Sequence, residues 1–147
     1  MSEHERLAFL ATQPFGVLAT VGPSGDPHQA TVGFSMDGSD RLVLSSFAAA
    51  QKVCNVRRVP RASFLVETSV PYSEIRGVLV RGGVEIVDDL AEVSAWHYRQ
   101  KERSARLLPP DNLPPMDDDR VIAKRVALIL SVEHVVSWDH RKLNGVY

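Results

Sequence analysis

The stretch "FGVLATVGPSGDPHQATVGFSM", residues 15–36, decides the expected fold. Residues 15–21 and 27–36 are both rich in the β-branched and apolar side chains that strands favour. Between them, "GPSGD" (22–26) combines two glycines, a proline, and serine and aspartate side chains that bond to their own backbone. The stretch therefore predicts two strands joined by a turn, which is a β-hairpin.

Further short strands follow this hairpin. We predict strands over residues 41–47, 61–68 and 76–89, the last one long and bent at Gly82-Gly83. Residues 124–139 hold a sixth strand and the pattern for a seventh. Helices are predicted over 3–11, 48–58 and 90–106. This pattern indicates a mainly β protein, a six- to seven-stranded barrel with few helices, in one domain over residues 1–147.

The composition narrows the function classes. A net charge of −1 and a pI near 6.5 argue against a dedicated nucleic-acid binder. No apolar run approaches the ~20 residues of a membrane span, and the first residues are acidic where a signal peptide would be basic. The five histidines lack paired metal-ligand spacing, so no metal site is expected. We therefore expect a cytoplasmic protein that binds neither nucleic acid nor membrane.

One region carries a local excess of positive charge. No acidic residue occurs between Asp40 and Glu67, and a predicted strand within this region runs into a predicted helix. The start of a helix attracts anions, and a lysine there opposes the helix dipole unless an anion is present. Lys52 is such a lysine, so the turn is a candidate phosphate site. Its candidate residues are Ser45, Ser46, Gln51 and Lys52.

The rest of this region is open to two interpretations. Arg57, Arg58 and Arg61 either contact the same anionic ligand or are solvated surface charges. The nucleotide-binding patterns "GxxxxGK[ST]" and "GxGxxG" are absent, so neither of those phosphate loops is present. Cys54, on the same predicted helix, is expected to be a small buried residue.

Three segments, in order, carry a resemblance to a known family. They are "GVLATVGPSGDPHQATVGFSMDG" (16–38), "KVCNVRRVPRAS" (52–63) and "VRGGVEIVDD" (80–89). They are similar to the patterns "ATxxxDGxPHxxxVxF", "KxxNxxRxPRAS" and "VEGxAxIVDD" of the pyridoxamine 5′-phosphate oxidase-like, FMN-binding split β-barrels. The resemblance covers residues 5–90 and, loosely, the C-terminal strand.

Within that family the chain resembles the branch that uses the deazaflavin coenzyme F-420. The oxidases carry "RxVLLK" on their second strand, whereas residues 29–34 read "QATVGF" and lack the arginine and lysine that hold the FMN phosphate. The resemblance implies a homodimer with coenzyme F-420 at the subunit interface. It also implies an oxidoreductase that transfers hydride from the reduced coenzyme to an unsaturated small-molecule substrate. It assigns no catalytic residue.

The resemblance also implies site residues. Thr31, Val32 and Gly33 match the strand that lies against the ring system, and Tyr72 lies near the cofactor or substrate face. The segment "VVSWDHRKL" (135–143) resembles the "FWxxxxxRL" end of the oxidases, where the tryptophan and arginine reach the partner subunit's flavin. Trp138 and Arg141 are therefore candidates for the same role.

Two other functions compete with the reductase. One is an FMN-binding protein or oxidase of the same fold, because FMN occupies the same groove. The other is a non-catalytic carrier of a flavin, of coenzyme F-420 or of haem, which needs the same phosphate site. The proline-rich segment "LLPPDNLPPMDDD" (107–119) is either a lid over the site or an ordinary surface loop.

Overall fold

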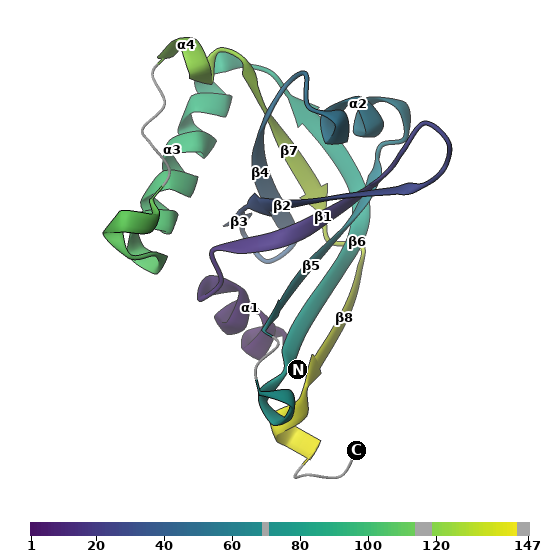
Figure 1. Ribbon diagram of the computed structural model, residues 1–147, viewed down its shortest axis with the longest axis vertical. Coiled ribbons are helices and arrows are strands. Elements are labelled where there is room, and N and C mark those ends of the chain that lie inside the picture. The colour runs from purple at the N-terminus through teal and green to yellow at the C-terminus, as the bar shows by residue number, and fades with distance from the viewer. Residues whose placement is uncertain (69–70, 114–118, 144–147) are drawn as a thin grey trace.

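The structure is a computed structural model, and it describes residues 1–68, 71–113 and 119–143. Strands dominate it (Figure 1). The strands are β1 (Phe15–Val21), β2 (Pro27–Gly33), β3 (Ser35–Asp37), β4 (Arg41–Phe47), β5 (Arg61–Thr68), β6 (Arg76–Val87), β7 (Arg125–Ser131) and β8 (His134–Asp139). The helices are α1 (Glu3–Ala11), α2 (Gln51–Arg58), α3 (Leu90–Leu107) and α4 (Asp119–Ile122), with short 3₁₀ turns η1 (Tyr72–Glu74), η2 (Pro110–Asn112) and η3 (His140–Leu143).

The strands form one curled antiparallel sheet in the order β2-β1-β5-β6-β7-β4-β3, and β8 pairs with β6. The twelve-residue β6 connects the two halves of the sheet. Its residues 76–81 pair with β8, and its residues 84–87 pair with β7. The change of partner falls at Gly82-Gly83, where the sequence predicts the bend. The predicted mainly β split barrel is confirmed.

The strand predicted over residues 27–36 is divided in two, and this raises the number of strands in the described residues to eight. β2 pairs with β1 and ends at Gly33, whereas β3 begins at Ser35 and pairs with β4. Phe34, at the break, is completely buried. Its ring makes an edge contact with Phe64 at 5.1 Å between centroids, and the Arg103 guanidinium lies 4.3 Å from its centre. Burial of this aromatic side chain accounts for the break, which periodicity alone does not reveal.

The hydrophobic core has two parts. The larger part fills the inside of the curled sheet and includes Leu18, Phe34, Leu44, Phe64 and Val80. The smaller part lies between α3 and the outer side of β4 and β7, and its members are Val43, Val93, Ile122, Ala127 and Ile129. Helix α3 therefore covers the outer face of β4 (Figure 1).

Helix α2 is attached to the sheet by a buried polar contact. The Asn55 side chain is 0% exposed, donates to Thr20 Oγ1 at 3.0 Å and accepts from Gln51 Nε2 at 2.8 Å. Val53 and Val56 of the same helix are buried, whereas Cys54 is exposed, so the expectation of a buried cysteine is wrong. No helix in the described part of the chain is long and apolar enough to cross a membrane.

Candidate functional site

The predicted phosphate site lies where β4 leads into α2. Ala50 is the N-cap of α2 and provides no side-chain cap, and the first turn of the helix contains no acidic residue. The Ala50 N–H bonds to Phe47 O at 3.0 Å and the Val53 N–H bonds to Ala50 O at 2.9 Å, so the N–H groups of Gln51 and Lys52 are left to meet an anion at this uncapped start. Arg57 reaches back from the last turn of α2, and its Nη1 donates to the carbonyl of Ala48 at 3.1 Å. The structure therefore brings Gln51, Lys52 and Arg57 together at this turn.

A second cation joins Lys52 there. Burial, and after it the positive charge of Arg125, lower the pKa of Lys52. Arg125 begins β7 opposite Phe47, and its guanidinium lies 4.1 Å from the centre of the Phe47 ring. Two neighbouring cations in a partly buried place repel each other, and both attract an anion. Sequence reasoning missed Arg125 because the pairing of β4 with β7 joins positions 78 residues apart, Phe47 and Arg125.

The two predicted serines do not share a face. Ser46 is only 3% exposed and its Oγ donates to its neighbour's carbonyl, so its hydroxyl faces inward. Ser45 faces outward toward α3, because successive strand residues point to opposite sides. Its backbone N–H donates to Gln100 Oε1 at 3.2 Å, and its Oγ lies 3.3 Å from His97 Nδ1. Of the two serines, only Ser45 therefore has its side chain on the outer face of β4, toward α3.

Helix α3 closes over this part of β4. It leaves a cavity of about 140 Å³, lined by Phe15, Ser45, His97, Gln100, Lys101, Ser104 and Arg125. Gln100 also lies against Gly33, where any Cβ would collide with its Nε2. Gly33 thus allows another group to come close to its backbone, as its predicted contact with the cofactor ring requires. In this structure the group that comes close is the Gln100 side chain. His97, which is 5% exposed, and Gln100 are residues that the sequence did not single out.

The remaining residues of the predicted ring-binding strand alternate in orientation. Thr31 is exposed, and Val32 is partly buried against the core inside the sheet. Of these two side chains, only that of Thr31 is therefore open to a ligand on the outer face of β2.

The other predicted residues lie far from Lys52 within one chain. Tyr72, Trp138 and Arg141 belong to η1, β8 and η3, near the C-terminal end of the molecule, whereas α2 lies toward the opposite end (Figure 1). Tyr72 is 61% exposed, and its ring meets His140 edge-on at 4.9 Å. Trp138 packs on Gly77, where its ring leaves no room for a Cβ.

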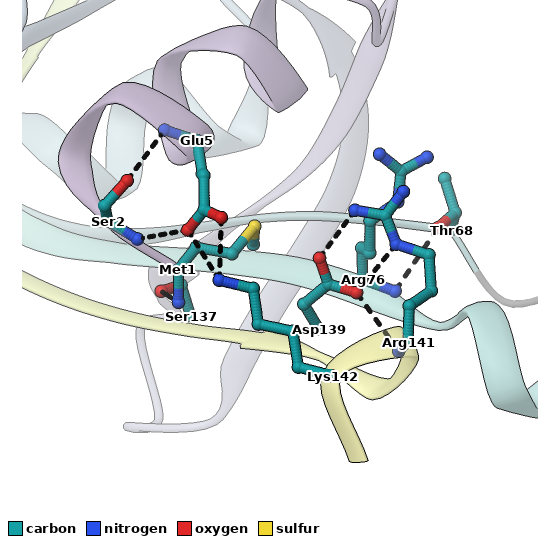
Figure 2. Close-up of polar contacts among 9 residues, drawn as sticks. All are labelled: Met1, Ser2, Glu5, Thr68, Arg76, Ser137, Asp139, Arg141 and Lys142. Atoms are coloured by element: carbon teal, nitrogen blue, oxygen red, sulfur yellow. Dashed lines mark hydrogen bonds and ion pairs between the residues drawn. The ribbon is translucent and has the colours of Figure 1, made fainter. Parts of the chain in front are cut away.

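Arg141 is held by a carboxylate of its own chain (Figure 2). Its Nε and Nη2 donate to the two oxygens of Asp139 at 2.8 and 2.6 Å, and its backbone N–H adds a third bond. These hydrogen bonds with Arg141 hold the pKa of Asp139 below its usual range against the opposing effect of burial. Asp139 is 8% exposed, so the pair fixes the end of β8.

Comparison with known proteins identifies the fold family. The family model of pyridoxamine 5′-phosphate oxidase matches residues 2–139. The chain belongs to this family. A conserved hypothetical protein from Mycobacterium tuberculosis is 33% identical to this family member, with a TM-score of 0.83 over 100% of this chain and 90% of the other.

The names of two proteins similar to this chain state an enzymatic activity. A solved structure named F-420 reductase is 26% identical, with a TM-score of 0.70 over 87% of this chain and 94% of the other. The 5a,11a-dehydrotetracycline/5a,11a-dehydrooxytetracycline reductase of Streptomyces rimosus is 31% identical over 84 residues. That match covers 53% of this chain and 58% of the reductase, so the similarity spans little more than half of either protein.

Metal binding has no support in the described ranges. Residues 1–68, 71–113 and 119–143 contain no group of three or more histidine, cysteine, aspartate or glutamate side chains placed to hold a metal ion. The predicted lid, residues 107–119, includes 114–118, which lie outside the described residues.

Proposed function

We propose that this family member is an oxidoreductase that uses coenzyme F-420 to reduce an unsaturated small organic molecule. The observation that carries the proposal is the pair of Lys52 and Arg125 at the uncapped start of α2, which suits a phosphate. The names of the two functional relatives support a reductase. Bound in its reduced form, the coenzyme would supply the hydride, and the protein would supply binding and orientation.

The residues present fit the charged part of this coenzyme. Lys52, Arg125 and the Ser45 N–H would hold the phosphate, with Gln51 beside them. Arg57 is placed to meet a carboxylate of the glutamyl tail, since it lies over the same turn. The other two arginines have partners of their own. Arg58 donates to the carbonyl of Val21, and Arg61 pairs with Glu133 at 2.7 Å, so we assign them structural roles.

The ring system would lie along β2 beside Thr31 and Gly33. Gln100 now accepts the Ser45 N–H with a neutral amide oxygen and lies against Gly33. An acceptor oxygen of the coenzyme would take its place at Ser45, so we propose that binding displaces the Gln100 side chain. β2 contains neither lysine nor arginine, which disfavours FMN, the competing cofactor, at this strand.

The outer face of the other half of the sheet supports a homodimer. A row of apolar residues crosses four neighbouring strands, from Val17 through Leu65 and Leu79 to Val136. The first three are only partly buried and Val136 is 45% exposed. Covering such a row with a second copy would bury apolar area.

A second copy would also reconcile the two groups of predicted residues. Tyr72, Trp138 and Arg141 lie on η1, β8 and η3, toward the other end of the chain from α2 and Lys52 (Figure 1). In the homodimer they would instead approach the coenzyme held by the partner. Arg141 could then contribute only after loosening its bonds to Asp139, whereas Tyr72 is already exposed.

Fluorescence titration with coenzyme F-420 tests the proposed site. Lys52→Ala and Arg125→Ala should each weaken binding about tenfold or more, because each removes a cation from a partly buried phosphate contact. Arg120→Ala, which removes the same charge from an exposed position on α4, serves as the matched control and should bind normally. Equal affinities for all four proteins would show that the coenzyme does not use this turn.

A further inference from the structure

A second cavity lies inside the curled sheet, whereas the cavity beneath α3 lies on its outer face. Its volume is about 290 Å³. Its floor consists of fully buried apolar residues, Leu10 of α1, Leu42 of β4, and Val78 and Val80 of β6. Protein interiors are packed about as closely as organic crystals, and voids larger than a water molecule are few. An engineered apolar cavity of about 150 Å³ already binds benzene, so this one is large enough for a small ligand.

The cavity lies at the open seam of the barrel. β3 is the last strand of its end of the sheet, and β8 pairs with β6, so the described strands are not joined between β3 and β8. Val132 lies in the link from β7 to β8, and its N–H donates to Asp40 O in the β3–β4 turn at 2.7 Å. Helix α1 lies across the opening beside these two segments. The mouth is therefore built by three separate parts of the chain.

The side of α1 that faces the cavity combines apolar and charged residues. Residues 3, 6, 7 and 10 line the cavity, which is the spacing of one helical face. A helix side that packs on a core presents a stripe of apolar residues. Here Leu7 and Leu10 are apolar, but Glu3 and Arg6 are charged and stand at the mouth, where Asp40 faces them from the β3–β4 turn.

The charges at the mouth select the ligand. Two carboxylates, Glu3 and Asp40, outnumber the single guanidinium of Arg6, and neither carboxylate forms an ion pair within the described ranges. Two carboxylates alone do not make a metal site, in agreement with the lack of metal clusters in that part of the chain. A cation with an apolar body matches both the mouth and the floor.

We propose that this cavity is a binding site for a small amphipathic amine, with the apolar body inside the sheet and the ammonium group between Glu3 and Asp40. None of the residues predicted to hold the coenzyme lines the cavity. The site is therefore independent of the proposed function, and neither depends on the other.

Nuclear magnetic resonance of the methyl groups tests this proposal with three probes of similar shape. Phenethylamine, 2-phenylethanol and 3-phenylpropionate are titrated into the full chain. Phenethylamine should shift the methyl signals of Leu42 and Val80, with an affinity about fivefold above that of the alcohol. The propionate should bind most weakly. If the propionate binds as well as the amine, or if none of the probes shifts these signals, the proposal is overturned.

Variants locate the bound amine. Val135→Phe fills the cavity from its wall and should abolish the shifts. The double variant Glu3→Gln with Asp40→Asn changes only exposed residues, so it preserves the fold and should remove the preference for the amine over the alcohol. Lys52→Ala should leave amine binding unchanged. A preference that survives the double variant would contradict the assigned role of the two carboxylates.

Discussion

Replacing Gly82 with alanine tests the corner at which β6 changes partners. A Cβ at this position would stand 2.9 Å from the carbonyl carbon of Ser131 and would overlap its oxygen outright. The obstacle is backbone and not a flexible side chain. It is fixed at the end of β7, where Glu133 N–H also bonds to Arg81 O at 3.2 Å. The corner therefore has to open before an alanine fits.

The expected cost follows from this overlap. Forcing an extra methyl group into a closely packed place costs typically 1–3 kcal/mol, and a backbone obstacle puts Gly82→Ala near about 3 kcal/mol. Gly83→Ala is the matched control, because the nearest atom to its Cβ would be the movable Glu133 Oε1 at 3.3 Å. Both variants restrict the unfolded chain equally, so Gly83→Ala should stay within about 1 kcal/mol of the unchanged protein.

Urea unfolding followed by circular dichroism measures both variants. With a slope of about 1.5 kcal/mol per molar urea, Gly82→Ala should lower the midpoint by roughly 2 M, and Gly83→Ala should move it far less. If the two midpoints fall by the same amount, the close contact between Gly82 and the Ser131 carbonyl at the end of β7 does not exist.

Three further predictions concern single side chains. Arg141→Ala should lower the melting temperature at neutral pH, and this difference should disappear in acid. The pKa of Asp139 is depressed in the folded protein, so the stability that Asp139 contributes is lost as the pH falls below ~3.9 and through its folded pKa. A difference in melting temperature that does not depend on pH would contradict this. Asn55→Ala should cost about 2 kcal/mol in urea unfolding, since it leaves the buried Thr20 hydroxyl without its donor, and a negligible loss would refute the role of that contact. Gln100→Glu should weaken binding of coenzyme F-420 about tenfold in the fluorescence titration, because the new carboxylate neutralises nearby cations. Gln100→Ala should not weaken binding. Equal losses of affinity in the two variants would show that Gln100 itself holds the coenzyme.

Much of the fold could be predicted from the sequence because its signals are local. The turn residues 22–26 and the alternation around them give β1 and β2 with the correct first residues, and Pro60 marks the boundary before β5. The glycine pair 82–83 marks the corner of β6. The break at Phe34 could not be predicted, because it depends on Phe64 and Arg103, which are distant in the sequence.

The candidate site was predictable only in part for the same reason. Lys52 is a candidate on a local signal, because a lysine in a first helical turn is unfavourable without an anion. Arg125 and Gln100 reach the site through strand pairing and through the docking of α3, and neither residue has a local signal. Arg141 and Asp139 are only two positions apart in the sequence, but a resemblance between motifs does not reveal that their side chains bond to each other.

Equilibrium dialysis against an equimolar mixture of coenzyme F-420 and FMN shows which of the two cofactors the protein prefers. The compound retained by the protein is identified by its absorption spectrum. Coenzyme F-420 should be retained in preference to FMN, since β2 offers no cation to the FMN phosphate and Lys52 with Arg125 offers two to an anionic ligand at α2. Retention of FMN in preference, or of neither compound, would contradict this prediction.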